Sequence, residues 1–475
     1  MTLGNFGRAM GGGFGSTRNA VAMAAAMLAF AATAFVPAVL NDGDTFLHIA
    51  AGLRMLDARA VLFADPFSYT HAGAPWQAHE WLAEIAMAFA WRVSGWSGLL
   101  ALFAGAAALT AGVLNWALGR RLVPKMQGAV TLLAMLCMTG SLLARPHLLA
   151  LPLLAIWTAG LVRARDEDRA PSFWLLPVMA LWINIHGSFL AGLAVAAGLA
   201  LEALIAQRSA RVLRDWGLFG LGALAAALLN PQGVAGVLFP LTLMATPSLG
   251  AVGEWQATTL SLFQPIVPVA LAGLYVIVTR RVRLSLVRAA MLAGLLAMAL
   301  LHVRHQIVFA TVAPLLLAAP LATAFGESED VRRWPAASAA FAGVIVLLLA
   351  LRLSWPMVRS DSPVAPIAAL AHVPPALRAQ PVLNDYAFGG YLIFAGVRPY
   401  IDSRVELYGE AALARYAALI RPDPKMLDAE LARWRIRWAI LPPASPIVAE
   451  LGARGWRQIW RDGVAVVQIR DGAPR

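Results

Sequence analysis

Long apolar segments recur through the first 355 residues of the chain. Each is close to the roughly 20 residues that a helix needs to cross the hydrocarbon core of a bilayer. A backbone inside that core must satisfy its own hydrogen bonds, which favours helices. The segments lie at 20–40, 97–118, 128–143, 146–162, 172–186, 188–206, 215–230, 263–279, 286–301, 305–325 and 335–355. The sequence therefore predicts a polytopic α-helical membrane protein with about eleven transmembrane helices.

The composition supports this prediction. Of the 475 residues, 60% are hydrophobic and 13% are charged, whereas soluble domains have about 45–50% apolar and about 25% charged residues. A typical soluble enzyme and a disordered chain are thereby excluded. The single cysteine, Cys137, excludes an intrachain disulfide and a cysteine-cluster metal site. The first apolar run follows Arg8 and Arg18 like a signal peptide, but it is long enough to span and lacks a clear cleavage site. We interpret it as an uncleaved first helix.

The basic residues indicate an orientation. With the N-terminus in the cytoplasm, 17 of the 38 Lys and Arg residues lie in loops on that side, 5 lie in opposite loops before residue 352, and 16 follow from Arg352 onward. Basic residues are enriched in cytoplasmic loops. The odd number of spans then places the C-terminal segment outside the cytoplasm. Because topology explains most of the net charge of +12 within the membrane region, we expect no nucleic-acid partner.

The sequence divides into three parts. Residues 1–19 form a cytoplasmic tail, 20–358 a transmembrane domain with a first extracytoplasmic loop at 41–95, and 359–475 an extracytoplasmic α/β domain. Alternating apolar residues and turn signals in the last part predict strands at 381–383, 391–394, 438–441 and 464–469. Helices are predicted there at 427–436 and 446–454.

Polar side chains in the predicted membrane region gather toward the outside. The cytoplasmic helix ends carry arginine but no histidine. Polar groups at membrane depth are costly and often mark function, although helix ends also meet water and collect polar residues for that reason. The residues that fall in outside loops or at outside helix ends are His48, His71, His79, His147, His186, His302, His305, Asn184, Asn230, Glu254, Arg145 and Arg304.

The first outside loop begins with Asp42, Gly43 and Asp44, and His48 follows. Three interpretations remain open. The two carboxylates and His48 could bind a divalent metal such as Mg or Mn. One carboxylate could act as a general base for a hydroxyl nucleophile. Alternatively, Asp44 could simply cap the next helix.

Three other outside segments carry polar residues. His79 and Glu80 begin like a zinc-protease motif, but Ala83 stands where the second histidine is required, so that interpretation is excluded. The pairs Arg145–His147 and Arg304–His305 lie in tight turns. Arginine and histidine together can hold a phosphate by charge-assisted hydrogen bonds. The alternative for both arginines is snorkelling to the lipid headgroups.

Several strings of residues resemble a known family. They are Asp42 through His48 to Gly52, Asp65 through Thr70, Trp76 with His79 through Leu82, and, near the C-terminus, Asn384 through Tyr386, Gly389 through Leu392 and Tyr400 through Arg404. They are similar to bacterial polytopic proteins of the GT-C glycosyltransferase superfamily, in particular the RgtA/B/C/D-like and dolichyl-phosphate-mannose-protein mannosyltransferase-like groups. The resemblance covers nearly the whole chain. The first-loop pattern is moderately specific and the rest is topological.

The resemblance implies a GT-C-like transmembrane domain in a bacterial inner membrane. It implies a polyprenyl-phosphate-linked sugar donor and transfer, on the extracytoplasmic face, to a hydroxyl of a glycan, lipid or protein acceptor. An essential acid is expected at the start of the first loop, for which Asp44 is the first choice and Asp42 the second. The chain departs from the oligosaccharyltransferase branch, since it has no WWDYG-type acceptor motif.

Together the residues and the resemblance give a set of site predictions. The donor phosphate is assigned to Arg145, His147, Arg304 and His305, and the further candidates are His48, His79, Glu80, His186 and Glu254. Two other functions remain open. A transporter or flippase of lipid-linked glycans is expected to place ionisable residues near the bilayer midplane. A non-catalytic scaffold of an envelope glycan system would depend on the C-terminal domain alone.

Overall fold

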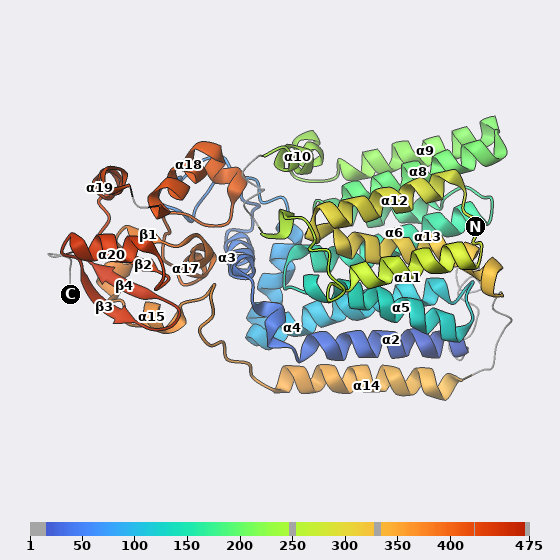
Figure 1. The fold of residues 1–475 in the computed structure, drawn as a ribbon, viewed down its shortest axis with the longest axis horizontal. Helices are drawn as coiled ribbons and strands as arrows, with labels where there is room; N and C mark the ends of the chain where they lie inside the picture. Colours follow the sequence, from blue (N-terminus) through green and yellow to red (C-terminus); the bar gives the residue numbers. More distant parts are fainter. Residues whose placement is uncertain (1–15, 247–252, 327–333, 422, 471–475) are drawn as a thin grey trace.

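The computed structural model of the chain describes residues 16–246, 253–326, 334–421 and 423–470. The predicted tail 1–19 lies almost wholly outside them. Most of the helices run side by side along the long axis, and the C-terminal domain sits at one end of this bundle (Figure 1). We call this end of the bundle the domain end.

All eleven predicted segments coincide with helices. These are α2 (Thr17–Ala34), the second half of α4 (Trp81–Leu118), α5 (Pro124–Met138), α6 (Pro146–Asp166), α7 (Leu176–Ile183), α8 (Phe189–Gln207), α9 (Ala210–Ala227), α11 (Ile266–Thr279), α12 (Leu286–Leu301), α13 (Gln306–Phe325) and α14 (Pro335–Ser354). The predicted apolar segments do not cover α3 (Gly43–Ala58), whose start near Asp44 was one of the alternatives for the first loop. They also do not cover α10 (Val234–Met244) or the first half of α4, which joins the second half through a kink at Ser94 and Gly95.

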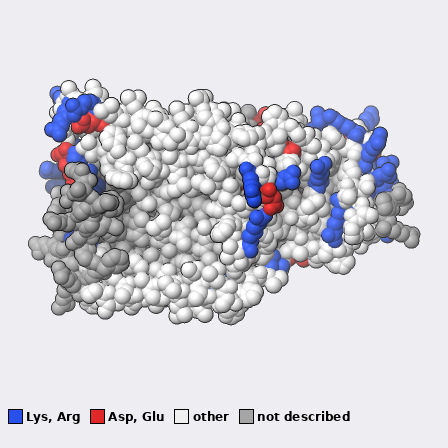
Figure 2. Space-filling model, turned by 180° about the vertical axis from the view of Figure 1, so that it is seen from behind, with Lys and Arg blue, Asp and Glu red and all other residues white. Residues whose placement is uncertain are grey.

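Five helices in the described ranges are long and apolar enough to cross a membrane. They cover Trp81–Leu118, Pro146–Asp166, Phe189–Gln207, Val303–Phe325 and Pro335–Ser354. The chain is thus a multi-pass membrane protein, but the predicted number of about eleven spans is not confirmed. Several other apolar helices are shorter than the roughly 20 residues of a full crossing. One face of the bundle shows a broad band almost free of acidic and basic side chains between two charged ends (Figure 2).

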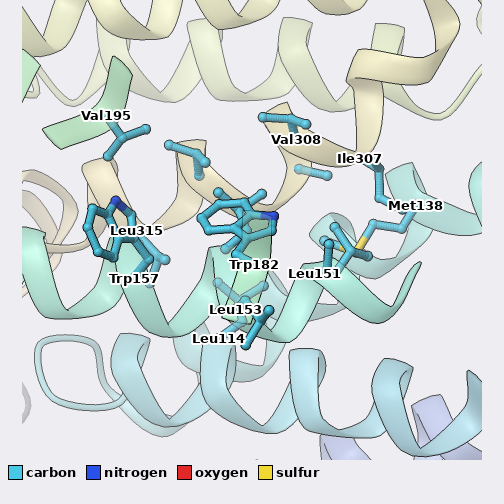
Figure 3. Close-up of a cluster of buried hydrophobic side chains, with 14 of the residues drawn as sticks. Leu114, Met138, Leu151, Leu153, Trp157, Trp182, Val195, Ile307, Val308 and Leu315 are labelled. Atoms are coloured by element: carbon cyan, nitrogen blue, oxygen red, sulfur yellow. The ribbon is translucent and has the colours of Figure 1, made fainter. Parts of the chain in front are cut away.

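The bundle core is closely packed around two tryptophans (Figure 3). Trp157 of α6 donates its indole N–H to the Gly192 carbonyl of α8 at 2.8 Å, and Trp182 of α7 donates to the Ser188 hydroxyl at 3.0 Å. Both rings are fully buried, so satisfying these donors avoids a desolvation cost. The two indoles therefore hold α6, α7 and α8 together.

The C-terminal domain contains a four-stranded sheet of order β1-β2-β4-β3. Its strands are β1 (Val382–Asn384), β2 (Trp438–Leu441), β3 (Arg457–Arg461) and β4 (Val466–Ile469). The β1–β2 pair is parallel and the other two pairs are antiparallel. Its helices are α15 (Ile367–Ala371), α16 (Pro375–Arg378), α17 (Gly389–Phe394), α18 (Val405–Ile420), α19 (Pro424–Arg433) and α20 (Pro446–Ala453). Three predicted strands and both predicted helices are confirmed, whereas β3 and α18 were not predicted.

The strand predicted at 391–394 is wrong, because these residues belong to α17. A helix brings positions three apart onto one face, and the rings of Tyr391 and Phe394 both contact Phe46 of α3, with centroids 5.3 and 5.6 Å apart. Gly390 also packs so closely on α3 that an added Cβ would lie 2.3 Å from the Gly43 carbonyl oxygen. This contact between α17 and α3 sets the C-terminal domain directly on the start of the first loop.

Candidate active site

The site begins at the N-terminus of α3. Asp42 is the N-cap, and its carboxylate accepts a hydrogen bond from the Asp44 backbone N–H at 2.8 Å. The cap is therefore Asp42, and Asp44 lies in the first turn with its side chain free for other contacts. The Thr45 hydroxyl donates to the Ala144 carbonyl at 3.0 Å. That bond ties α3 to the turn that precedes α6, and so places Arg145 beside the two aspartates.

Arg145 lies among three carboxylates. Its guanidinium nitrogens are 2.7 Å from the Asp44 carboxylate, 3.6 Å from that of Asp42 and 2.7 Å from that of Glu254. The other oxygen of Glu254 is 3.1 Å from Arg304. The structure thus brings five predicted residues, from four separate segments, into one chain of ion pairs. We call Asp42, Asp44, Arg145, Glu254 and Arg304 the arginine–carboxylate cluster.

The cluster shifts the ionisation of its members. Burial raises the pKa of Asp44, but the positive charges of Arg145 and His48 outweigh burial and hold it below the usual value. For Asp42, burial outweighs Arg145, and its pKa is raised. The carboxylates around Arg145 overcome its burial and raise its pKa further. At neutral pH the cluster therefore holds an ionised Asp44 against a fixed guanidinium.

A second group of charges lies one helical turn away. His48 follows Asp44 by four residues on α3, which places both on one face. Its Nδ1 is 3.0 Å from Glu84 and its Nε2 is 3.7 Å from Glu80. Glu80 in turn lies 3.5 Å from His186 and 3.8 Å from His79. We call His48, His79, Glu80, Glu84 and His186 the histidine–glutamate cluster.

His48 is the charged centre of this second cluster. Burial lowers its pKa, but the hydrogen bond that His48 donates to Glu84 and the charges of Glu80, Glu84 and Asp44 outweigh burial and raise it to about 9. The imidazolium therefore persists at neutral pH and adds a positive charge behind Asp44.

Two predicted phosphate ligands lie at the edge of the clusters. The Nε2 of His147 is 2.8 Å from the Ser141 carbonyl oxygen, and its ring centroid is 6.1 Å from that of His186. The ring of His305 packs near Trp255 and His302, at 6.4 and 5.7 Å between centroids. The assignment of His147 and His305 as ligands of the donor phosphate stays a prediction.

The predicted metal ligands do not gather as a metal site. Within the described parts of the chain, no group of three or more His, Cys, Asp or Glu side chains could hold a metal ion. The Asp44 carboxylate faces Arg145, and the His48 imidazole faces Glu84. The predicted Mg or Mn site at Asp42, Asp44 and His48 stays a prediction.

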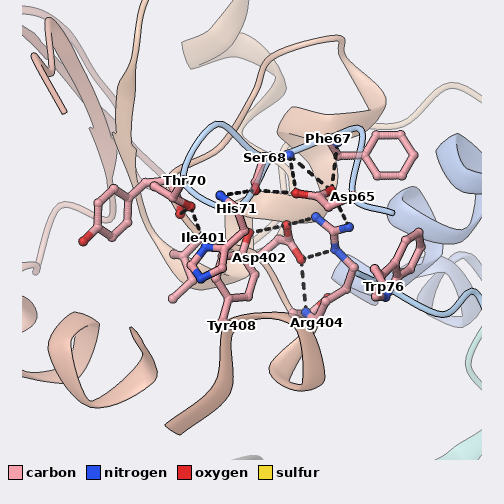
Figure 4. A network of polar contacts seen from close by, with 12 residues as sticks. Asp65, Phe67, Ser68, Thr70, His71, Trp76, Ile401, Asp402, Arg404 and Tyr408 are labelled. Atoms are coloured by element: carbon pink, nitrogen blue, oxygen red, sulfur yellow. Dashed lines mark hydrogen bonds and ion pairs between the residues drawn. The ribbon is translucent and has the colours of Figure 1, made fainter. Parts of the chain in front are cut away.

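An interdomain clamp lies beside the site (Figure 4). Arg404 of the C-terminal domain binds Asp65 of the first loop at 2.7 Å and Asp402 at 2.6 Å. Tyr408 donates a hydrogen bond to the same Asp402 carboxylate at 2.7 Å, and the ring of Trp76 lies 4.7 Å from the guanidinium carbon. Two strings behind the family resemblance, 65–70 and 400–404, therefore meet and join the first loop to the C-terminal domain.

The sequence reasoning missed three residues of the site. Glu84 is buried on α4, and its spacing of four from Glu80 inside an apolar helix was the signal for it. Ser403 follows Asp402 in the clamp, and its buried hydroxyl lies near enough to Asp44 to help lower the pKa of that carboxyl, although it makes no hydrogen bond of normal geometry. The Tyr386 hydroxyl donates to the Ser403 carbonyl at 3.3 Å. Nothing in the sequence could connect these two C-terminal residues with Asp44.

An apolar cavity lies in the helical bundle. It has a volume of about 380 Å³ and lies between α2 and α5, where Leu28, Leu132 and Met135 line it. Leu142, at the domain end of this lining, is three residues before Arg145. An alkyl or isoprenoid chain would find an apolar surface here.

The arrangement of helices and C-terminal domain defines a class of protein, the multi-pass membrane proteins that carry a small α/β domain on one end of a helical bundle. One solved structure that shows this likeness is ArnT from Cupriavidus metallidurans bound to undecaprenyl phosphate. The match covers 96% of this chain and 98% of that one, with a TM-score of 0.51 and 12% sequence identity. At this identity the likeness establishes the fold, which confirms the predicted resemblance at that level. No family model and no curated protein matches the sequence.

Proposed function

We propose that the protein is a glycosyltransferase that moves a pentosyl or hexosyl unit from a polyprenyl-phosphate donor to a hydroxyl acceptor. The acceptor is a glycan, a lipid or a protein. The site lies on the extracytoplasmic face of a bacterial inner membrane, with the N-terminus in the cytoplasm and the C-terminal domain outside. The fold shared with ArnT, a protein solved with undecaprenyl phosphate bound, supports the donor class.

The observation that carries the proposal is the contact between Asp44 and Arg145. An ionised carboxylate lies 2.7 Å from a guanidinium, and Arg304 stands across Glu254 from the same guanidinium. A group that can accept a proton and two groups that can stabilise a departing phosphate therefore share one site. Acid–base and electrostatic catalysis need these groups at this proximity.

The chemistry follows from these positions. The acceptor oxygen attacks the anomeric carbon of the sugar, and its proton passes to the Asp44 carboxylate as the new carbon–oxygen bond forms. The bond between the anomeric carbon and the phosphate oxygen breaks, and its electron pair stays on that oxygen. Arg145 and Arg304 stabilise the phosphate charge that develops. The imidazolium of His48 keeps Asp44 ionised until the proton arrives.

The apolar cavity between α2 and α5 supports a lipid-linked donor. Leu142 lines the cavity and precedes Arg145 by three residues, so a polyprenyl chain that lay there would run beside the segment that leads to Arg145. Holding the reacting groups in place in this way accounts for a large part of the rate enhancement of most enzymes.

Substitution of Asp44 by Asn tests the proposal. The full-length protein is assayed in proteoliposomes for release of undecaprenyl phosphate from undecaprenyl-phosphate pentoses and hexoses, with envelope glycolipids as acceptors. We expect a loss of at least about 100-fold. Asp57→Asn on the same helix is the matched control, since Asp57 is exposed and pairs only with Arg92 among the described contacts. Full activity of Asp44→Asn at normal expression would contradict the assignment and favour a scaffold.

A further inference from the structure

One carboxylate in the site occupies a place that suits a phosphate. The two oxygens of Glu254 reach two different arginines, Arg145 at 2.7 Å and Arg304 at 3.1 Å. Phosphate groups are commonly held in this way, with separate oxygens accepting charge-assisted hydrogen bonds from separate guanidinium groups. The Glu254 side chain is 27% exposed, so an incoming group can reach it from solvent.

The segment that carries Glu254 is docked firmly on the end of α12 and the start of α13. The Thr258 N–H donates to the Leu300 carbonyl at 2.8 Å, and the Val303 N–H donates to the Gln256 carbonyl at 3.1 Å. The neighbouring ring of Trp255 lies 4.3 Å from the Arg304 guanidinium carbon. The backbone beside Glu254 is therefore fixed next to the arginines, while the side chain can turn toward or away from them.

The charges make an exchange of anions possible. Arg145 also pairs with Asp42 and Asp44, whereas Glu254 is the only carboxylate paired with Arg304 among the described residues. A partly buried guanidinium that loses its partner is destabilised, so Arg304 needs an anion whether or not substrate is present. Glu254 supplies one negative charge. The phosphodiester of a polyprenyl-phosphate sugar also carries one negative charge, so its arrival in place of the carboxylate leaves the net charge of the site unchanged.

We propose that Glu254 is a built-in anion that holds the donor-phosphate position and is displaced from it by the donor phosphate. The inference rests on the proposed function, since it assigns a role within the same site. Glu254 then acts as a specificity-determining residue, because a lipid without a phosphate cannot compete with the carboxylate for the two arginines. The return of Glu254 to the arginines also favours release of the lipid product.

Binding of undecaprenyl phosphate to the full-length protein in detergent tests this inference. Glu254→Gln removes the competing charge, and we expect the Kd to fall about tenfold, within the 5- to 150-fold range that couplings of this kind usually show. Inorganic phosphate should compete better in the variant than in the wild type. Undecaprenol, which has no phosphate, should bind both proteins equally.

The controls separate the inference from the proposed function. Glu450→Gln removes a carboxylate from a pair with Arg454 at 2.6 Å in the C-terminal domain, and it should leave the Kd unchanged. Arg145→Ala should raise the Kd strongly. If Arg145→Ala binds undecaprenyl phosphate as the wild type does, the proposed phosphate site is wrong. If Arg145→Ala loses affinity while Glu254→Gln and Glu254→Ala do not gain it, the role of Glu254 alone is overturned.

Discussion

Arg404 and Asp65, which lie 339 residues apart in the sequence, form an ion pair of 2.7 Å with almost no exposure of either side chain. The pair joins the C-terminal domain to the loop between α3 and α4. The same domain also packs on the start of the first loop, where an added Cβ at Gly390 would lie 2.3 Å from the Gly43 carbonyl oxygen. The C-terminal domain is therefore part of the wall of the candidate active site.

Replacing Arg404 by Ala should destabilise this interface. The change leaves the carboxylates of Asp65 and Asp402 buried without their common partner, and breaking a buried pair in this way costs about 3–5 kcal/mol. We expect a lower Tm and faster proteolysis of the first loop. Arg433→Ala is the control, because Arg433 is exposed at the surface of the same domain and its loss should change stability by less than about 0.5 kcal/mol. Equal melting of the two variants would contradict the role of the clamp.

The close packing of α17 on α3 gives a second prediction. A Cβ at position 390 would lie 2.3 Å from the Gly43 carbonyl oxygen, a backbone atom that cannot move aside easily. Gly390→Ala should therefore displace α17, lower the Tm and reduce transfer activity. Gly343→Ala on α14, where an added Cβ meets nothing within 4 Å, should leave both unchanged. If Gly390→Ala has the same Tm as the control, the close packing of α17 on α3 is not needed for stability.

The stability of the protein should depend on pH through His48. Its pKa is raised from 6.5 to about 9 by Glu84 and Glu80, against the effect of burial. A group with a higher pKa in the folded state stabilises the fold fully below its unfolded pKa, and this contribution is lost as the pH rises through the folded value. We expect a loss of up to about 3 kcal/mol between pH 6.5 and 9. Thermal unfolding of His48→Gln should lack this loss, and equal pH profiles of the variant and the wild type would refute the assignment.

A chelator tests whether the transfer activity depends on a bound metal ion. Because Asp44 pairs with Arg145, and His48 pairs with Glu84, we expect transfer activity to survive EDTA. The rate of release of undecaprenyl phosphate is the measurement, with and without added Mg²⁺ or Mn²⁺. Loss of activity in EDTA, with recovery on addition of either ion, would restore the metal interpretation of Asp42 and Asp44.

Much of the site was visible in the sequence as a set of residue types at one end of the helices. Arg145 and Arg304 were singled out because they lie in outside turns, and Asp44 because it opens the first loop. The sequence does not show which side chains Arg145, Arg304 and Asp44 contact. Snorkelling remained an equal alternative for both arginines until the structure placed Glu254 between them.

The sequence by itself determined the membrane class and the helical segments, because every spanning segment must carry its own run of apolar residues and those runs are local. It also determined three of the four strands by local alternation. Only the tertiary structure decided how Asp44, Arg145 and Glu254 meet, that residues 391–394 form a helix, and that two distant strings form the clamp of Asp65 and Arg404. These features depend on contacts between residues far apart in the chain. Such contacts produce no periodic pattern or apolar run in the sequence from which they could be predicted.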